Sequence, residues 1–110
     1  MALAEPLPLV AVHPAPAERA VIWLRGEHDL ATVSATAEDI SRAIAFDEAD
    51  LVVDLSGVTF LDASTINVLV KVREYLRIRD RSLEVRAPSA CAARLLDLCS
   101  LSHLVGARPA

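Results

Sequence analysis

Two adjacent hydroxyl side chains, Ser64 and Thr65, stand where the sequence changes from a turn to a helical pattern. They follow Asp62 at a spacing that allows two kinds of chemistry. Oxygen atoms of such side chains at a helix start accept hydrogen bonds from the free backbone N–H groups, which is a capping role. A serine hydroxyl can also act as a nucleophile, but only when a neighbouring group activates it.

An enzyme would need a base beside Ser64, and His28 is the candidate. Asp29, Asp54 or Asp62 would then orient the histidine ring. However, the Gly-x-Ser-x-Gly turn that exposes a catalytic serine is absent, and nothing in the chain order joins the histidine to the serine. We therefore predict a protein that is not an enzyme and has no catalytic residues.

Metal ions and cofactors have no matching pattern either. His13, His28 and His103 are scattered, and none forms a ligand pair at helical or hairpin spacing, so we expect surface or capping histidines. The chain has only three glycines, and they do not gather in a phosphate-binding loop. We predict neither a metal site nor a cofactor.

The charge balance argues against a nucleic-acid partner. The chain carries 11 basic and 15 acidic side chains, for a formal net charge of -4, and its arginines are dispersed between carboxylates. Nucleic-acid binding needs concentrated positive charge. No apolar run approaches the ~20 residues of a membrane helix, and the first twelve residues lack the basic segment of a secretory signal. We expect a cytoplasmic protein that contacts neither nucleic acid nor membrane.

Length and composition predict one domain. The 110 residues, 54% of them hydrophobic and 24% charged, suit a single compact core. We expect this domain to span residues 1–110, with the core over about 7–105 and a frayed tail over 106–110.

Four segments have the composition of β-strands, namely 7–12, 20–24, 51–55 and 83–86. Prolines on both sides of the first segment withhold backbone donors, so it is an edge strand or a loose arm. The second should stop at Arg25-Gly26 and the third at Ser56-Gly57. The third is apolar on both faces except for Asp54, which favours a central position in the sheet.

Three segments have a helical pattern, namely 29–44, about 62–79 and 88–99. The first shows the apolar stripe Leu30, Val33, Ala37, Ile40 and Ile44, with spacings of three and four. The second opens on Asp62 as its cap. Strands that alternate with helices predict parallel neighbours and right-handed crossovers. We therefore expect an α/β fold, with a small mixed sheet of about four strands and three to four helices packed against it.

The faces of the second helix follow from 100° per residue. An arc expected to face the sheet contains Val68, Leu69, Val72, Tyr75 and Leu76. Ile66 and Val70 fall outside it, flanked by Arg73 and Arg77, while Asn67 faces water. Apolar side chains edged by arginine suit a protein interface, although isolated exposed aliphatic residues are also common. The predicted partner-binding residues are Ile66, Asn67, Val70 and Arg73.

A longer segment resembles a known signature. It reads Asp54-Leu-Ser-Gly-Val-Thr-Phe-Leu-Asp-Ala-Ser-Thr-Ile-Asn-Val-Leu69. This is similar to the phosphorylation-site signature of STAS-domain anti-sigma factor antagonists, commonly Asp-Leu-Ser-x-Val-x-Phe-x-Asp-Ser-Ser-Gly-Leu-Gly. In addition, Gly26-Glu-His-Asp29 resembles the family's Gly-Glu-x-Asp, and residues 95–104 resemble its closing helix. The order and spacing of these blocks match as well.

The resemblance implies a STAS fold and a partner switch. The unphosphorylated protein would bind an anti-sigma factor with serine kinase activity and so free a sigma factor. Phosphorylation at Ser64, or at the adjacent Thr65, would end the binding, and a phosphatase would reset it. Asp29, Asp62 and Ala63 would surround the phosphosite, with Ala63 standing where a serine is frequent in the family. The kinase would carry ATP and magnesium, and the chain itself would be a monomer or weak dimer.

The physics of such a switch predicts an effect on binding rather than on folding. A phosphate adds roughly -1.5 to -2 charges and three acceptor oxygens. A helix N-terminus tolerates it, whereas a docked partner would have to desolvate it. The alternative is a STAS scaffold or sensory module without kinase control, which would form a large self-assembly rather than a discrete complex.

Overall fold

The computed structural model describes residues 10–14, 19–45 and 49–106. Its elements in chain order are β1 (Val10–Pro14), β2 (Arg19–His28), α1 (Val33–Ala45), β3 (Asp50–Leu61), α2 (Ala63–Ile78), β4 (Leu83–Arg86), α3 (Ala90–Leu98) and the short 3-10 helix η1 (Ser102–Leu104). The first part of the predicted strand 7–12 and the predicted frayed residues 107–110 lie outside the described residues. Gly106 is held in place, because its N–H donates to the Val85 carbonyl at 2.8 Å.

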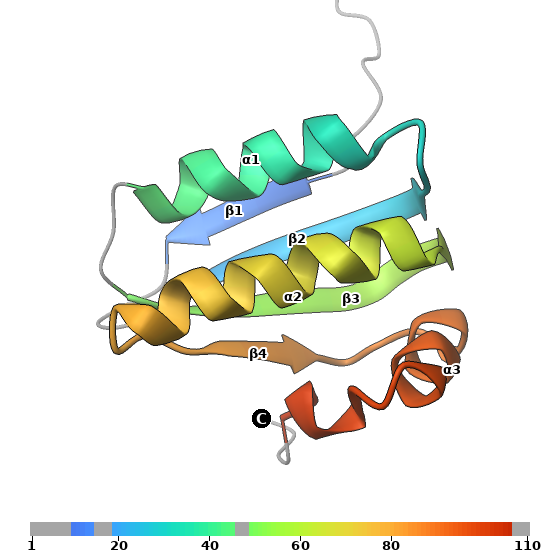
Figure 1. Cartoon of the computed structure of the whole chain (residues 1–110). Coiled ribbons are helices and arrows are strands. Elements are labelled where there is room, and N and C mark those ends of the chain that lie inside the picture. The colour runs from blue at the N-terminus through green and yellow to red at the C-terminus, as the bar shows by residue number, and fades with distance from the viewer. Residues whose placement is uncertain (1–9, 15–18, 46–48, 107–110) are drawn as a thin grey trace, which may run out of the picture.

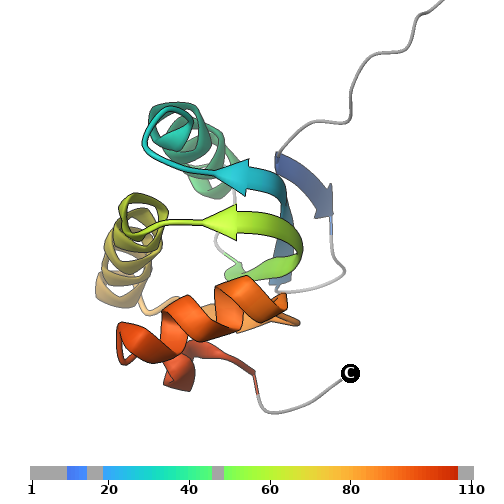
Figure 2. The ribbon, with the colours of Figure 1, turned by 90° about the vertical axis from the view of Figure 1, so that its right-hand side faces the viewer.

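The four strands form one mixed sheet in the order β1-β2-β3-β4. β1 runs antiparallel to β2, whereas β2, β3 and β4 are parallel to one another. Figure 1 shows α1 and α2 side by side over the same face of this sheet, and Figure 2 shows the same layering from the side. The third helix, α3, packs against β3. The predicted α/β class with a mixed four-stranded sheet is thus confirmed.

The core lies between the sheet and the two long helices. Ile22 and Leu24 of β2 and Val53 and Leu55 of β3 are fully buried there. Residues 51–55 of β3 are all buried, as expected for a central strand covered on both faces. The helices contribute Ile40 of α1 and Ile66, Leu69, Val72 and Leu76 of α2 to this core.

Two strands are longer than predicted. β2 continues past Arg25-Gly26 to His28, and β3 continues past Ser56-Gly57 to Leu61. The register between them shifts on both sides of Arg25, which pairs with Gly57. A Cβ on Gly57 would lie 3.2 Å from the Arg25 Cγ, so the glycine permits a close approach within an irregular strand pair. The dipeptides Arg25-Gly26 and Ser56-Gly57 therefore mark an irregular, bent part of the two strands and not their ends.

Helix α1 begins at Val33, four residues later than predicted. The Asp29 Oδ1 accepts the N–H groups of Ala31 and Thr32 at 3.0 and 3.2 Å, which closes a turn before the helix. Leu30 sits in this turn with 74% of its side chain exposed, so its assignment to the buried helical stripe is wrong.

Neither a membrane-spanning helix nor a metal cluster appears in the described part of the chain. None of the described helices is both long and apolar enough to cross a bilayer. No three described His, Cys, Asp or Glu side chains gather closely enough to hold a metal ion.

Candidate functional site at the start of helix α2

Asp62 caps helix α2, as its position in the sequence predicts. Its backbone is extended, with φ -119° and ψ 178°, and its Oδ1 accepts the N–H groups of Ser64 and Thr65 at 3.0 and 3.4 Å. These are two of the donors that the first turn of any helix leaves free. The sequence-predicted cap is confirmed, and it fixes where the following hydroxyl side chains lie.

The hydroxyl of Ser64 bonds the same carboxylate. Ser64 Oγ donates to Asp62 Oδ1 at 2.5 Å, and Ser64 is partly exposed. This hydrogen bond is the main reason that the pKa of the Asp62 carboxyl lies below its ordinary value, and the backbone N–H groups of Thr65, Ser64 and Leu30 lower it further against the opposing effect of burial. Ser64 is therefore a partly exposed serine at a helix N-terminus.

Thr65 differs from Ser64 in its environment. Its side chain is 0% exposed, and its hydroxyl has no hydrogen-bond partner among the described residues. A modifying enzyme could reach this hydroxyl only if the first turn of α2 opened. Of the two candidate residues, Ser64 is partly exposed and Thr65 is buried.

The turn between β2 and α1 lies beside the cap. The Asp62 N–H donates to the His28 carbonyl at 3.2 Å, which ties the end of β3 to the end of β2. The predicted neighbour Asp29, which follows His28, therefore lies close to Asp62. Its carboxylate, however, accepts the N–H groups of Ala31 and Thr32 within its own turn. The predicted neighbour Ala63 is the exposed first residue of α2.

Sequence reasoning missed two exposed apolar side chains at this end of the sheet. Leu30 is 74% exposed in the turn that contacts Asp62, and Phe60 is 48% exposed two residues before Asp62. The exposure of Leu30 could have been inferred from Asp29 and Thr32, because an aspartate with a threonine three residues later is typical of a turn before a helix.

The predicted partner-binding residues of α2 have different environments. Asn67 is exposed, Val70 is 37% exposed and Arg73 is partly exposed. Ile66 is only 4% exposed and belongs to the core, so the prediction that it lies outside the core is wrong. Ile66 cannot contact a partner while α2 stays packed.

The exposure of Tyr75 explains why the burial of Ile66 was not predicted. We expected it to face the sheet, but it is 39% exposed. The buried stripe of α2 consists of Thr65, Ile66, Leu69, Val72 and Leu76, and is thus rotated toward Ile66 and away from Tyr75. On the Tyr75 side, α2 borders a groove that Ala37 and Ser41 of α1 also line, and the Arg79 guanidinium lies 3.7 Å from the centre of the Tyr75 ring.

His28 is buried and engaged within the fold. Its Nε2 lies 2.9 Å from the Arg25 carbonyl, and its Nδ1 lies 3.3 Å from the Thr36 hydroxyl. Burial lowers its pKa, against weaker opposing effects of Arg25 and Asp29. The expectation of a surface histidine is wrong here, because His28 points inward from β2 toward α1. The Ser64 hydroxyl bonds Asp62, and not this histidine.

Asp54, the first residue of the signature-like segment, ties β3 to β4. It is 5% exposed and accepts hydrogen bonds from the Ser56 N–H, the Ser56 hydroxyl and the Arg86 Nε, at 2.9, 2.6 and 2.9 Å. Burial opposes the ionisation of Asp54, but these hydrogen bonds outweigh it and hold its pKa below the ordinary value. The Arg86 guanidinium also lies 5.4 Å from the centre of the Trp23 ring. Asp54 thus fixes β4 to β3, the strand that leads to Asp62.

Three solved structures resemble this fold. The anti-sigma factor antagonist SpoIIAA in its unphosphorylated form gives a TM-score of 0.77 at 19% identity, over 88% of this chain and 85% of that one. An anti-sigma factor antagonist from Mycobacterium paratuberculosis gives 0.78 at 25% identity, over 92% and 85%. The Bacillus cell fate determinant SpoIIAA in its phosphorylated form gives 0.69 at 21% identity, over 88% of each chain.

Sequence comparison identifies the family. A search of curated proteins finds no match to this sequence. The protein family described as "Mlab, STAS domain" matches residues 13–106, which include β2, the capped helix α2 and the closing segment. Because this match spans most of the chain, the protein belongs to the STAS-domain family.

Proposed function

We propose that this protein is an anti-sigma factor antagonist that is switched by phosphorylation of Ser64. The unphosphorylated form binds an anti-sigma factor with serine kinase activity and so releases a sigma factor. Similarity to solved antagonists supports the general role, and SpoIIAA is one that exists in unphosphorylated and phosphorylated forms. The observation that carries the switch is the partly exposed Ser64 at the start of α2, beside the buried Thr65.

The modification itself is a phosphoryl transfer catalysed by the partner. The Ser64 Oγ forms a bond to the γ-phosphorus of ATP, the bond to the β-phosphate oxygen breaks, and ADP leaves. The hydroxyl proton, which points to Asp62 in the free protein, passes to a base. A phosphatase reverses the state by hydrolysis, which returns the hydroxyl and releases inorganic phosphate.

Phosphorylation changes the charge of the cap and leaves its hydrogen-bond donors in place. The Ser64 hydroxyl no longer donates to Asp62, and roughly -1.5 to -2 charges appear beside that carboxylate. The N–H groups of the first turn can bond phosphate oxygens in place of Asp62, and the helix dipole favours the added charge. We expect helix α2 to persist in the phosphorylated protein.

The proposed docking surface begins beside this cap and extends along the outer side of α2 as far as Arg73. It consists of Asn67, Val70 and Arg73 on the outer side of α2, and of Leu30 in the neighbouring turn. The Leu30 N–H contacts the Asp62 carboxylate, so the two parts of the surface meet at the phosphosite. A partner that covers them would have to desolvate a phosphate beside a carboxylate, and this cost prevents binding.

The test compares Ser64→Ala and Ser64→Asp as baits in a lysate of the protein's own cells. We expect Ser64→Ala to retain a protein with serine kinase activity and Ser64→Asp to lose it, while the melting temperatures differ by about 5 °C or less. Thr65→Val is the matched control and should retain the partner. Equal retention by both Ser64 variants would contradict the switch, and unfolding of Ser64→Asp would show that Ser64 is structural.

A STAS scaffold or sensory module is the second candidate function. The matching family is described as "Mlab, STAS domain", which does not mention sigma factors. Such a module would assemble with similar domains without a kinase. Light scattering on the purified chain separates the two functions, because the antagonist is expected to be a monomer or weak dimer and the scaffold a large assembly.

A further inference from the structure

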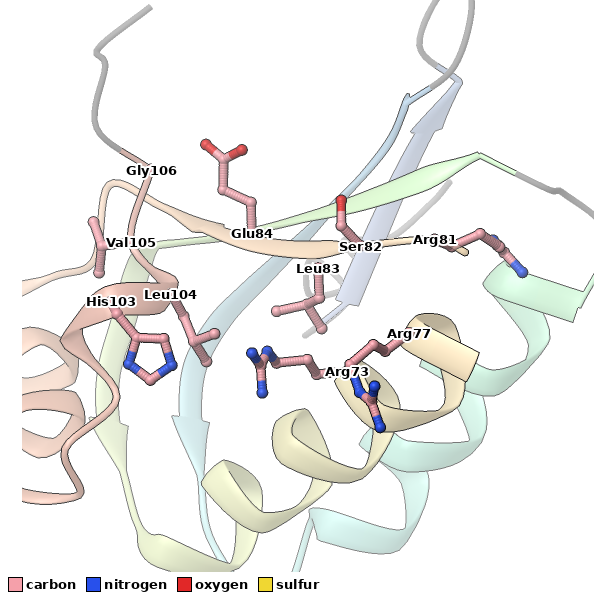
Figure 3. Close-up of a pocket in the computed structure, with 10 residues that line it drawn as sticks. All are labelled: Arg73, Arg77, Arg81, Ser82, Leu83, Glu84, His103, Leu104, Val105 and Gly106. Atoms are coloured by element: carbon pink, nitrogen blue, oxygen red, sulfur yellow. The ribbon is translucent and has the colours of Figure 1, made fainter. Parts of the chain in front are cut away.

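A recess lies near the far end of α2 from Ser64, between the last turns of this helix, β4 and η1 (Figure 3). Its volume is ≈ 380 Å³. The side chains that matter for its chemistry are Arg73, Arg77, Leu83, His103, Leu104 and Val105. A recess of this size accommodates a few side chains or a small ligand.

Two nitrogen-bearing side chains project into the recess from opposite sides. Arg73 comes from α2 and His103 from η1 (Figure 3). Neither has an ion pair or side-chain hydrogen bond to a described residue, whereas Arg77 at the rim is bonded to Glu74. Arg73 and His103 therefore have donors available for an acceptor from outside the protein.

The other charged residues at the recess are directed elsewhere. The Arg81 side chain points away and donates to the Ala49 carbonyl at 2.9 Å (Figure 3). The Glu84 carboxylate also points away from Arg73 and pairs with Arg19 at 3.5 Å. Among the described carboxylates, that of Glu84 at the recess pairs with Arg19, and that of Glu74 outside it is bonded to Arg77 and interacts with Arg73 only through space. The recess is thus a local positive site on an acidic protein, which favours an anion.

The recess also offers apolar surface and a strand edge. Leu83, Leu104 and Val105 line it; Leu83 and Leu104 are buried in the core, and Val105 is partly exposed. The Ser82 carbonyl faces β3, where it accepts the Leu51 N–H, and the Val85 carbonyl faces the other way, where it accepts the Gly106 N–H. Because the backbone groups of a strand alternate in direction, the N–H and carbonyl of Leu83 point outward along the edge of β4.

We propose that this recess binds a short acidic segment of a partner protein in an extended conformation. A glutamate or aspartate side chain bonds Arg73 and His103, a neighbouring aliphatic side chain contacts Val105, and the peptide backbone pairs with Leu83. A free phosphate would use only the charged groups and would leave the apolar surface and the strand edge unused. The proposal does not depend on phosphorylation of Ser64.

The test is a titration of the full chain, monitored through its backbone amide NMR signals. The probes are a hexapeptide of alternating leucine and glutamate, the same peptide with glutamine in place of glutamate, and inorganic phosphate. We expect the glutamate peptide to shift the amides of Leu83, Leu104 and Val105 to saturation, and the glutamine peptide to bind about tenfold more weakly or not at all.

The Arg73→Gln variant should bind the glutamate peptide with about tenfold lower affinity, because one charge-assisted contact is lost. Arg42→Gln is the matched control, since it removes one exposed positive charge from α1 and should leave the affinity unchanged. The amide spectrum of each variant reports directly that it is folded. Absence of shifts with the glutamate peptide, equal binding of the glutamine peptide, or equal binding to Arg73→Gln would overturn the proposal. Phosphate that shifts these amides when the peptide does not would assign the recess to small anions and overturn it as well.

Discussion

The Ser64 hydroxyl and the Asp62 carboxylate are joined by a 2.5 Å hydrogen bond at the start of α2. The same Asp62 oxygen accepts the backbone N–H of Ser64 at 3.0 Å. The candidate phosphoacceptor and the helix cap are therefore one hydrogen-bonded unit. A change at Ser64 acts directly on the charge state and contacts of Asp62. Through these it affects a partner protein that docks at the start of α2.

The first prediction concerns the pKa of Asp62. It lies below the ordinary value chiefly because of the Ser64 hydroxyl, so Ser64→Ala should raise it. A carboxyl whose pKa is lower in the folded than in the unfolded state stabilises the fold above the unfolded pKa, and this stabilisation is lost as the pH falls through the folded pKa. A carbon-detected NMR titration of the Asp62 carboxyl measures the change directly. Thr65→Val is the control that should keep the pKa low, and an unchanged pKa in Ser64→Ala would contradict the hydrogen bond.

The second prediction contrasts two buried threonines. Thr65 has a hydroxyl without a partner in the described part of the chain, whereas the Thr36 hydroxyl contacts His28 at 3.3 Å. We expect Thr65→Val to keep the free energy of unfolding or raise it by up to about 1 kcal/mol, because valine fills the same space without a buried polar atom. Thr36→Val should lower it by about 1 kcal/mol. Urea denaturation of both variants checks this, and the reverse order would show that Thr65 has a partner.

The third prediction assigns Asp54 a structural role. Asp54→Asn should lower the free energy of unfolding by about 2 kcal/mol, because the change weakens three hydrogen bonds and leaves Arg86 without its counter-charge. Asp50→Asn is the control. Among the described residues, the Asp50 carboxylate accepts a single hydrogen bond, from the exposed Ser82 N–H at 2.9 Å, so this change should cost less than about 1 kcal/mol. Urea denaturation is again the measurement, and equal costs for the two variants would refute the assignment.

The fourth prediction is a pH dependence caused by His28. Its pKa is lowered by burial, so the unfolded chain takes up this proton at a higher pH than the folded protein does. Stability that is present above the ordinary histidine pKa of about 6.5 should be lost as the pH falls from there toward the folded value. His28→Asn should flatten the fall in melting temperature between about pH 7 and pH 5. His103→Gln changes an exposed histidine and should keep the slope, and an equally steep slope in His28→Asn would rule His28 out as its source.

The order of strands and helices could be predicted from the sequence because its signals are local. The apolar run 51–55 marks the central strand, and Asp62 before a helical pattern marks the cap of α2. The continuation of β3 beyond Gly57 could not be predicted in this way. Its cause is the pairing of Gly57 with Arg25 on a neighbouring strand, which no local pattern records.

The candidate site was predictable in part. The spacing of Asp62 and Ser64 placed a hydroxyl at the helix start, but it did not say which of the two hydroxyls is accessible. That signal was present in the stripe Thr65, Leu69, Val72 and Leu76, whose spacings of four, three and four continue the core face through Thr65. The burial of Ile66 and the exposure of Tyr75 depend on how α2 is rotated about its own axis against the sheet, and this follows from the packed structure alone.

The most direct test of the Ser64 switch is peptide-resolved mass spectrometry of the protein from its own cells, with and without phosphatase treatment. The account predicts one phosphate on Ser64 that phosphatase removes, and none on the buried Thr65. A phosphate on Thr65 would contradict the assignment of the accessible hydroxyl. An unmodified Ser64 under both growth and stress would contradict the switch and favour the scaffold or sensory function.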